Sequence, residues 1–257
     1  VFGNKYILKY EERIGPFNQY QLLYDAQVEY PRQYKRADDI DRLVIVKVKE
    51  AARGYERAFF FARNLSEFKK KAEKFIKEGR IRETDLKDAV IEEYLLGPQV
   101  NFNFFYSPLT DKLELLGTDL RRQTNIDGLI RLPADQQQEI LSYISPSYIE
   151  IGHVAVTVKE SLLEKAFNLA ERLVEAAKTY IPPGIIGPFA LQTAIVAGPP
   201  AEKIIIYDLS LRIPGSPGIG FTPYSHYLYG KSVSFGERIA MEIKLAIETQ
   251  SLAKITT

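Results

Sequence analysis

The chain has 257 residues, of which 46% are hydrophobic and 26% charged, and its 34 basic and 33 acidic side chains leave a net charge of +1 at pH 7. This balance argues against nucleic-acid binding, and the absence of cysteine excludes a disulfide framework, a thiolate nucleophile and a cysteine-based zinc site. No apolar run is long enough to cross a membrane and no signal peptide is recognisable, so we expect a cytoplasmic protein without a membrane partner.

The first strong element is a strand at residues 43–49, after a short helix at 21–26. It is apolar on both faces except where Lys47 interrupts it. A lysine inside a buried strand needs an anion, whereas on an edge strand it would point to solvent, and the strand alone allows both interpretations. A charged turn at 51–57 leads to a second strand at 58–62.

The next helix is expected to begin with Ser66 as its cap and to stop at Gly79. Its apolar residues recur at helical spacing and are interpreted as core; they are Phe68, Ala72, Phe75 and Ile76. A strand at 90–97 then carries two adjacent acids, Glu92 and Glu93.

A hairpin follows, with strands at 100–105 and 113–119. Asn101 and Asn103 alternate onto one face of its first strand, which predicts a polar inner face. Residues 119–128 show neither a helical nor a strand period, so we expect a loop that is either solvated or functional.

The remaining elements before the last strand follow from periodicity. They are a helix from Pro133 to about Tyr143, a strand at 148–158, a long helix from Ser161 to Pro182, and a strand at 189–196 that contains Gln192. The two histidines, His153 and His226, are too far apart in sequence for a local metal motif and are interpreted as structural.

The strand at 204–212 is the most informative segment of the chain. Strict alternation places Asp208, Ser210 and Arg212 on one face. Such a polar row either faces water or lines a polar cavity in which a cation and an anion are satisfied. The loop at 214–220 is rich in glycine and allows close approach of a ligand. The last helix opens with the capping box of Ser234 and Glu237 and is expected to bury Ile239, Ile243 and Ile247.

Hairpins and widely spaced elements predict an α+β fold rather than a doubly wound parallel sheet. Several short segments also occur in an order found in one family: residues 2–5 (FGNK), 44–47 (VIVK), 91–94 (IEEY), 105–108 (FYSP), 114–119 (ELLGTD), 125–128 (NIDG), 183–189 (PGIIGPF) and 223–225 (PYS). On these segments the chain resembles, over nearly all of its length, the archaeal formate-dependent 5-formaminoimidazole-4-carboxamide ribonucleotide (FAICAR) synthetases of purine (IMP) biosynthesis.

The resemblance implies the ATP-grasp fold, in which two α+β lobes clamp ATP. It implies a division into residues 1–36, a remnant or linker to a missing amino-terminal domain, 37–97 as the small lobe and 98–257 as the large lobe. On this resemblance we expect that the family's small amino-terminal α/β domain is not included in residues 1–257. The implied enzyme is a ligase that uses ATP, Mg²⁺ or Mn²⁺ and formate to convert aminoimidazole carboxamide ribonucleotide (AICAR) to FAICAR, and family members often form homo-oligomers.

The resemblance also assigns residues. Lys47, Arg122 and Arg212 are the implied catalytic residues. ATP is expected to contact Lys47, Arg53 and Gly54 of the phosphate loop at 51–57, and the segment of Glu92, Glu93 and Tyr94. Gln192 and Asp208 match the metal positions, and Asn125, Arg121 and Arg122 the positions near AICAR.

The chain departs from the family pattern after Arg212. The segment at 212–218 is shorter than in the family and lacks an asparagine that is a further candidate metal ligand, and the phosphate loop is poor in glycine. Two alternatives therefore stay open: a paralogue that binds nucleotide without turnover, and a ligase for a different pair of acid and amine.

Overall fold

The computed structural model describes residues 1–49 and 57–257 and divides the chain into two compact units. The larger unit comprises Val1–Leu8, Gln99–Thr193 and Asp208–Thr257, and the smaller comprises Lys9–Pro98 and Ala194–Tyr207. Helices occur together with antiparallel sheets, which confirms the α+β class. The functional division at residues 36 and 97 stays a prediction, and most of the predicted turn at 51–57 lies outside the described residues.

The smaller unit contains an antiparallel sheet in the order β1-β4-β2-β3. Its strands are β1 (Gln33–Tyr34), β2 (Val44–Lys49), β3 (Arg57–Ala62) and β4 (Val90–Glu93), and its α-helices are α1 (Gln19–Asp25) and α2 (Leu65–Lys77). Because β2 lies between β3 and β4, the edge-strand interpretation of Lys47 is wrong. The strand predicted at 90–97 ends earlier, at Glu93.

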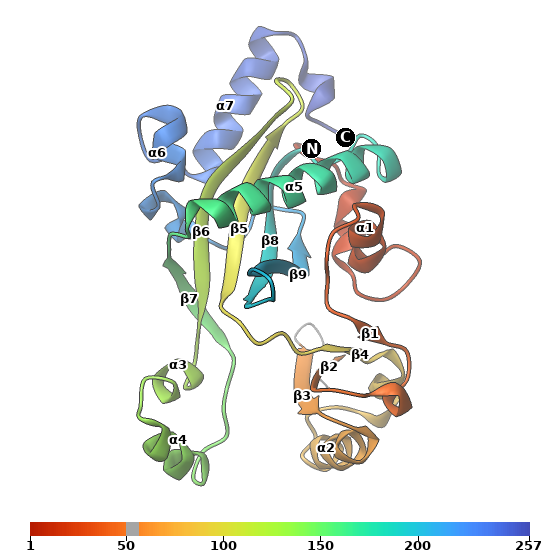
Figure 1. Cartoon of the computed structure of the whole chain (residues 1–257). Coiled ribbons are helices and arrows are strands. Elements are labelled where there is room, and N and C mark those ends of the chain that lie inside the picture. Colours follow the sequence, from red (N-terminus) through yellow and green to blue (C-terminus); the bar gives the residue numbers. More distant parts are fainter. Residues whose placement is uncertain (50–56) are drawn as a thin grey trace. The chain divides into compact units, whose positions relative to one another are not determined.

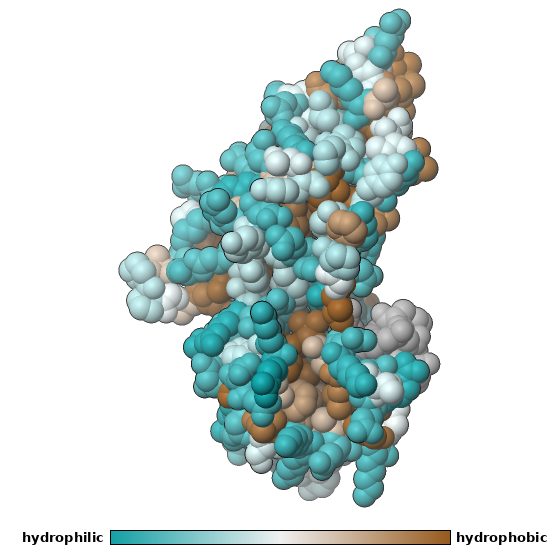
Figure 2. Space-filling model, turned by 90° about the vertical axis from the view of Figure 1, so that its right-hand side faces the viewer, coloured by the Kyte–Doolittle hydropathy of each residue, from teal (hydrophilic) through white to brown (hydrophobic). Residues whose placement is uncertain are grey.

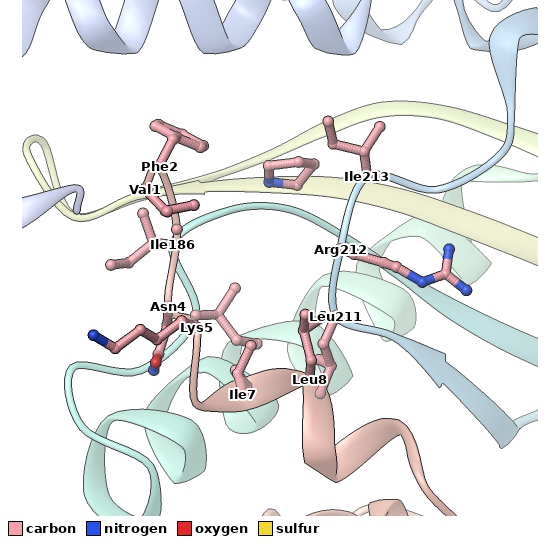
Figure 3. Close-up of a pocket in the computed structure, with 13 residues that line it drawn as sticks. Val1, Phe2, Asn4, Lys5, Ile7, Leu8, Ile186, Leu211, Arg212 and Ile213 are labelled. Atoms are coloured by element: carbon pink, nitrogen blue, oxygen red, sulfur yellow. The ribbon is translucent and has the colours of Figure 1, made fainter. Parts of the chain in front are cut away.

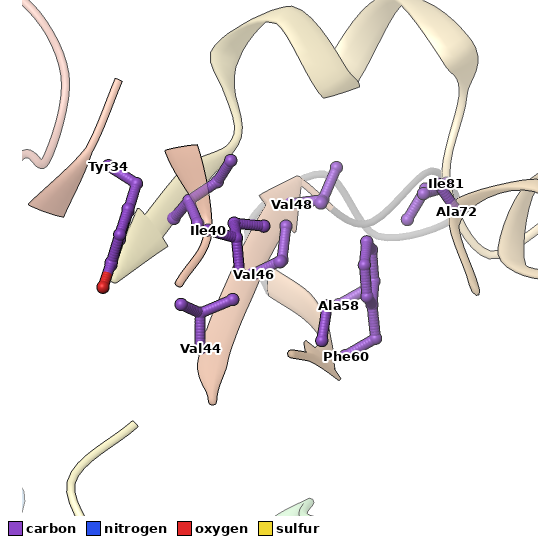
Figure 4. Close-up of a cluster of buried hydrophobic side chains, with 11 residues drawn as sticks. Tyr34, Ile40, Val44, Val46, Val48, Ala58, Phe60, Ala72 and Ile81 are labelled. Atoms are coloured by element: carbon purple, nitrogen blue, oxygen red, sulfur yellow. The ribbon is translucent and has the colours of Figure 1, made fainter. Parts of the chain in front are cut away.

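Alternation along β2 builds the core of this unit. Val44, Val46 and Val48 are fully buried and pack in one cluster with Phe60 of β3 and Ala72 of α2 (Figure 4). The helical stripe predicted as core, which includes Phe68 and Phe75, packs against the same cluster. Burial of branched side chains on one face of β2 leaves Ile45 and Lys47 on the opposite face.

Helix α2 begins two residues earlier than its sequence predicts. Asn64 is the N-cap, and its side-chain oxygen accepts a hydrogen bond from the Glu67 amide at 3.0 Å. The predicted cap, Ser66, lies inside the helix. Asparagine and serine cap helices about equally well, so composition alone does not choose between them.

The second sheet has the order β7-β6-β5-β8-β9. Its strands are β5 (Gln99–Ser107), β6 (Lys112–Gln123), β7 (Glu150–Ala155), β8 (Gly187–Val196) and β9 (Lys203–Ser210), and the boundary between the two units falls within β8 and β9. Helix α5 (Glu160–Tyr180) crosses strands of this sheet (Figure 1) and buries Leu162, Ala166, Leu169, Leu173 and Ala176, as its periodicity predicts. Phe104 of β5 packs between Phe167 of α5 and Phe189 of β8.

The predicted hairpin is confirmed, with Asn101 opposite Asp119 and Asn103 opposite Gly117. The loop predicted from residue 119 is wrong in its first part, because β6 continues to Gln123 and pairs there with β7. Pairing with a strand far along the chain overrides the weak local pattern. The helices α3 (Ile126–Leu129) and α4 (Ala134–Leu141) follow β6.

The last helix, α7 (Phe235–Glu248), has the predicted N-cap: Ser234 Oγ accepts a hydrogen bond from the Glu237 amide at 3.2 Å. The predicted buried face is wrong at Ile247, which is 59% exposed. Arg238 and Glu242 are buried on this helix instead. Arg238 donates to Glu242 at 2.9 Å and to both carboxylate oxygens of Glu114, so burial of the charges is offset by pairing.

Short helices complete the described part of the chain. They are α6 (Tyr224–Tyr229), which contains His226, and the 3-10 helices Ile7–Glu11, Ala37–Asp39, Glu83–Asp88, Pro217–Phe221 and Leu252–Lys254. The two ends of the chain lie side by side in the larger unit, where Phe2 forms a β-bridge with Thr256 (Figure 1). Hydrophilic residues cover most of the face in Figure 2, and none of the helices in the described residues is long and apolar enough to cross a membrane.

Candidate functional site

A buried ion pair connects two strands of the smaller unit. Lys47 on β2 and Glu92 on β4 have side chains that are 14% and 2% exposed, and Lys47 Nζ donates to Glu92 Oε1. The second carboxylate oxygen, Oε2, accepts a hydrogen bond from the Tyr20 hydroxyl at 2.7 Å. Lys47 Nζ also lies 5.8 Å from the centre of the Tyr207 ring. The anion that a buried lysine requires is therefore Glu92, and Lys47 is held in one position.

The other residues expected to contact ATP are partly engaged within the same unit. Arg42 donates to Glu93 Oε1 at 3.2 Å, and the Tyr94 amide donates to the Leu43 carbonyl oxygen at 3.0 Å. Arg53 and Gly54 lie outside the described residues. The assignment of this segment to adenine and ribose stays a prediction.

The larger unit contains a pocket of about 220 Å³ whose lining consists mainly of polar side chains, and we call it the polar pocket. It is formed by β5, β6, β7, β8 and the end of β9 with the loop that follows. Its lining includes Arg121, Glu150, His153, Gln192, Ser210 and Arg212. Three residues that the resemblance assigns to different roles, Arg121, Gln192 and Arg212, thus lie around one cavity.

A fully buried carboxylate lies at the start of a hydrogen-bond chain beneath this pocket. Asp119 of β6 accepts hydrogen bonds from the side-chain nitrogens of two asparagines, Asn101 Nδ2 at 2.8 Å and Asn103 Nδ2 at 2.6 Å. His153 Nδ1 hydrogen-bonds to the same carboxylate. Asp119 is therefore satisfied from both neighbouring strands, and it fixes the orientation of the His153 ring.

The series of hydrogen bonds continues from the His153 side chain to a residue of β8. His153 Nε2 lies 2.9 Å from Glu150 Oε1, and Arg121 Nε donates to Glu150 Oε2 at 3.0 Å. Arg121 Nη2 donates to Gln192 Oε1 at 2.8 Å. The guanidinium of Arg121 is consequently held on two sides, by a carboxylate from β7 and an amide oxygen from β8.

Ser210 and Arg212 of the polar row predicted at 204–212 line the pocket, whereas Asp208 of the same row is not in the lining. Ser210 and Ser216 are 5% and 2% exposed, and neither hydroxyl has a hydrogen-bond partner among the described residues. Asn103 Oδ1 lacks one as well. On the opposite face of the strand, Leu209 is buried.

A second pocket, of about 240 Å³, has a mostly apolar lining that includes Phe2, Ile7, Ile186 and Leu211. Arg212 lines this pocket too, but Figure 3 shows its guanidinium extending away from the side chains of Val1 and Ile186. Its aliphatic stem therefore packs on the apolar side while its charge points elsewhere.

A magnesium ion is usually held by one or two carboxylates together with substrate phosphates. The described residues contain no group of three or more histidine, aspartate or glutamate side chains suited to a metal. Asp208 fits this chemistry as a single carboxylate that precedes Ser210 on the same face of β9. Gln192 does not fit in this arrangement, because its oxygen accepts a hydrogen bond from the Arg121 cation.

Two residues predicted near the substrate lie elsewhere in the larger unit, outside the lining of the polar pocket. Arg122 Nε donates to Asp127 Oδ2 at 2.9 Å. Asn125 has a positive φ of 43°, and its side chain bonds the backbone of Ser145 and Ser147. Their roles in substrate binding stay predictions.

Sequence reasoning does not assign three polar residues of the pocket lining to a site: Glu150, His153 and Ser216. The sequence pattern places Asp119 where a strand gives way to a loop and gives no sign that His153 lies beside it, whereas the two are hydrogen-bonded to each other across β6 and β7. The available signal was the polar face of Asn101 and Asn103, which points at the buried carboxylate.

Comparison with known proteins gives consistent results. A family model described as "Domain of unknown function (DUF1297)" matches residues 67–257. The chain is 40% identical over 257 residues to the 5-formaminoimidazole-4-carboxamide-1-(beta)-D-ribofuranosyl 5'-monophosphate synthetase of Methanocaldococcus jannaschii, covering 99% of this chain and 69% of that protein. The crystal structure of an IMP biosynthesis protein PurP from Thermococcus kodakaraensis superposes with a TM-score of 0.70 at 25% identity, over 100% of this chain and 72% of that one.

A more distant structure supports the fold alone. An ATP-grasp superfamily protein from Archaeoglobus fulgidus superposes with a TM-score of 0.50 at 12% identity, over 91% of this chain and 57% of that one. The predicted ATP-grasp fold is therefore confirmed.

Proposed function

The chain belongs to the family of the 5-formaminoimidazole-4-carboxamide-1-(beta)-D-ribofuranosyl 5'-monophosphate synthetases, and from this membership we propose that it is an ATP-dependent carbon–nitrogen ligase of purine biosynthesis. ATP phosphorylates formate, which gives formyl phosphate and ADP. The amine of AICAR then attacks the formyl carbon, the bond from this carbon to the phosphate oxygen breaks, and FAICAR and phosphate are released. We expect the reaction to take place in the cytoplasm, in a homo-oligomer.

The observation that supports this proposal most directly is the position of Lys47. Its ammonium group is fixed inside the smaller unit by Glu92, on the central strand β2. A cation held in advance at the place where phosphate charge develops stabilises phosphoryl transfer without reorganisation during the reaction. Glu92 thus keeps the lysine oriented until the phosphates of ATP compete for it.

Asp208 is the proposed ligand of Mg²⁺ or Mn²⁺, and the ion when bound would offset the charge of the ATP phosphates. Gln192 joins this site only if its hydrogen bond with Arg121 opens. Arg122 and Arg212 remain proposed catalytic cations, since guanidinium groups suit phosphate and carboxylate oxygens.

The test is product formation with ATP, magnesium, formate and AICAR, followed by omission of each component. FAICAR is expected only when all four are present. Lys47→Gln is expected to lower kcat by about 100-fold or more, by analogy with the loss of one transition-state donor. Lys70→Gln on the exposed face of α2 is the matched control and is expected to leave the rate unchanged. FAICAR formation at the wild-type rate by Lys47→Gln would contradict the role of this lysine.

A second candidate is a relative that binds ATP without turnover. It is favoured by the engagement of Gln192 Oε1 with Arg121 and by the loop at 214–220, which has no asparagine. Calorimetric binding of ATP together with no formation of FAICAR, ADP or phosphate would support this candidate against the ligase. A different acid or amine substrate is the remaining alternative, and it predicts ADP release with another substrate pair.

A further inference from the structure

We propose that the polar pocket is a preorganised site for a small oxyanion, a carboxylate or a phosphate group, in which Arg121 is the binding cation and Ser210 and Ser216 are the hydroxyl donors. The inference rests on the proposed function only for the identity of the ligand: formate and the phosphate of AICAR are the two sources of such an oxyanion. The site itself is inferred from three features of the larger unit: the guanidinium groups that line the pocket, two buried hydroxyls without a partner among the described residues, and the hydrogen bonds that hold Arg121.

The charges around the pocket favour an anion. Two guanidinium groups, those of Arg121 and Arg212, line it. The carboxylate in the lining is Glu150, which is already bonded to Arg121 and His153. The second nearby carboxylate, Asp119, is buried and accepts from Asn101, Asn103 and His153. Glu150 and Asp119 thus already accept hydrogen bonds, whereas the five N–H groups of Arg121 exceed the two contacts that its Nε and Nη2 atoms make here.

Two buried hydroxyl groups supply donors. Ser210 and Ser216 line the pocket from the end of β9 and from the loop behind it, and both hydroxyls lack a partner among the described residues. Buried hydroxyls are normally hydrogen-bonded, so two unpartnered ones around one cavity require an explanation. An oxyanion that accepts from both hydroxyls and from a guanidinium satisfies them together.

The hydrogen-bond chain explains how Arg121 is positioned. Its Nε and Nη2 atoms are bound by Glu150 and Gln192, which reduces the entropy lost when a ligand binds. Glu150 is in turn held by His153, and His153 by the buried Asp119. His153 and Asp119 act on the ligand through Arg121, so they are positioning residues. Gln192 has the same role here, in place of the metal role that the family resemblance assigns to it.

The binding test uses the full chain and does not depend on turnover. Inorganic phosphate and formate are added separately, and the thermal unfolding midpoint is measured for the wild type and for Ser210→Ala/Ser216→Ala. Both alanines are expected to be tolerated without ligand, because they remove only unpartnered hydroxyls. At least one anion is expected to raise the wild-type midpoint and to lose most of that effect in the double variant. Equal shifts in both proteins, or no shift in the wild type, would overturn the proposal.

The kinetic test identifies the source of the oxyanion. In the double variant, the KM for formate or for AICAR is expected to rise by about tenfold while the KM for ATP stays within about twofold. A rise for formate places the carboxylate in the pocket, and a rise for AICAR places its phosphate there. A change in the KM for ATP alone would contradict the site. Ser225→Ala, a buried serine whose hydroxyl bonds the Val233 amide outside the pocket, is the matched control.

A separate measurement tests whether His153 and Asp119 position Arg121. His153→Gln is expected to raise the KM of the same substrate that the serine variants affect, with kcat changed by less than about threefold. A structural role alone would lower the stability without selecting one substrate. If the wild type forms no FAICAR at all, the proposed function fails, whereas the phosphate and formate shifts still decide whether the oxyanion site exists.

Discussion

The ion pair of Lys47 and Glu92 is the clearest case in which one residue explains another. Both side chains are largely buried, and both oxygens of Glu92 have donors, Lys47 and Tyr20. Removal of one member of a buried pair leaves an uncompensated charge, which costs more than the pair itself contributes.

Lys47→Met is therefore expected to lower the free energy of unfolding by about 3 kcal/mol. The double variant Lys47→Met/Glu92→Gln is expected to lose much less than the sum of the two single variants, because it removes both charges. Urea denaturation of the four proteins measures this coupling. Additive losses would show that the two side chains do not interact in solution.

Tyr229 predicts how stability depends on alkaline pH. Burial raises the pKa of the Tyr229 hydroxyl, and its hydrogen bond to Glu114 raises it further. Unfolded tyrosine ionises near pH 10, whereas the folded chain keeps this proton. The stabilisation is thus complete below about pH 10 and is lost as the pH rises toward the folded pKa.

Tyr229→Phe is expected to make the loss of stability between about pH 9 and pH 11 less steep than in the wild type. Tyr227→Phe is the control, because this neighbouring ring is 77% exposed. The measurement is the free energy of unfolding in urea at each pH. An identical slope for wild type and Tyr229→Phe would show that ionisation of Tyr229 is not linked to unfolding.

At the scale of single elements, α2 shows how accurately the sequence predicts where a helix begins. The sequence indicates a capped helix with a core-facing stripe, and the structure has one, but Asn64 rather than Ser66 accepts the hydrogen bond from the Glu67 amide. The two candidate caps are both polar and exposed. Backbone geometry, which is extended at Asn64, decides between them.

Asn64→Ala is consequently expected to destabilise the chain by about 1 kcal/mol, whereas Ser66→Ala is expected to change stability by less than about 0.5 kcal/mol. Thermal or urea unfolding of both variants checks the difference. A larger loss for Ser66→Ala than for Asn64→Ala would place the start of the helix at the position that the sequence predicts.

At the scale of the whole molecule, ATP is expected to stabilise the folded chain by mass action. A ligand that binds only the folded state adds about 2.7 kcal/mol at 100 times its Kd. The midpoint of thermal unfolding should therefore rise with the concentration of ATP and magnesium. The rise should be smaller for Lys47→Gln, which lacks the proposed phosphate contact, and should persist in Lys70→Gln. No rise in the wild type would contradict ATP binding.

The sequence by itself determined the fold class, most elements and the family. The apolar run at 43–49, the alternation at 204–210 and the apolar stripe of α5 depend on residues close together in the chain, so local patterns suffice to predict these elements. The same is true of the capping box at Ser234. The strand pattern alone did not decide whether Lys47 is buried or at an edge, and the order of the sheet, with β2 between β3 and β4, decided it.

Only the tertiary structure decided which polar residues meet. β6 continues through the predicted loop because it pairs with β7, and that pairing brings His153 onto Asp119. Arg121 reaches Gln192 across a distance of 71 residues in sequence. Such contacts depend on strand order and register, which are set by the packing of whole sheets and leave no periodic signal near the residues themselves. For the same reason the buried face of α7, with Arg238 and Glu242, follows from the carboxylate of Glu114 and not from the spacing of its isoleucines.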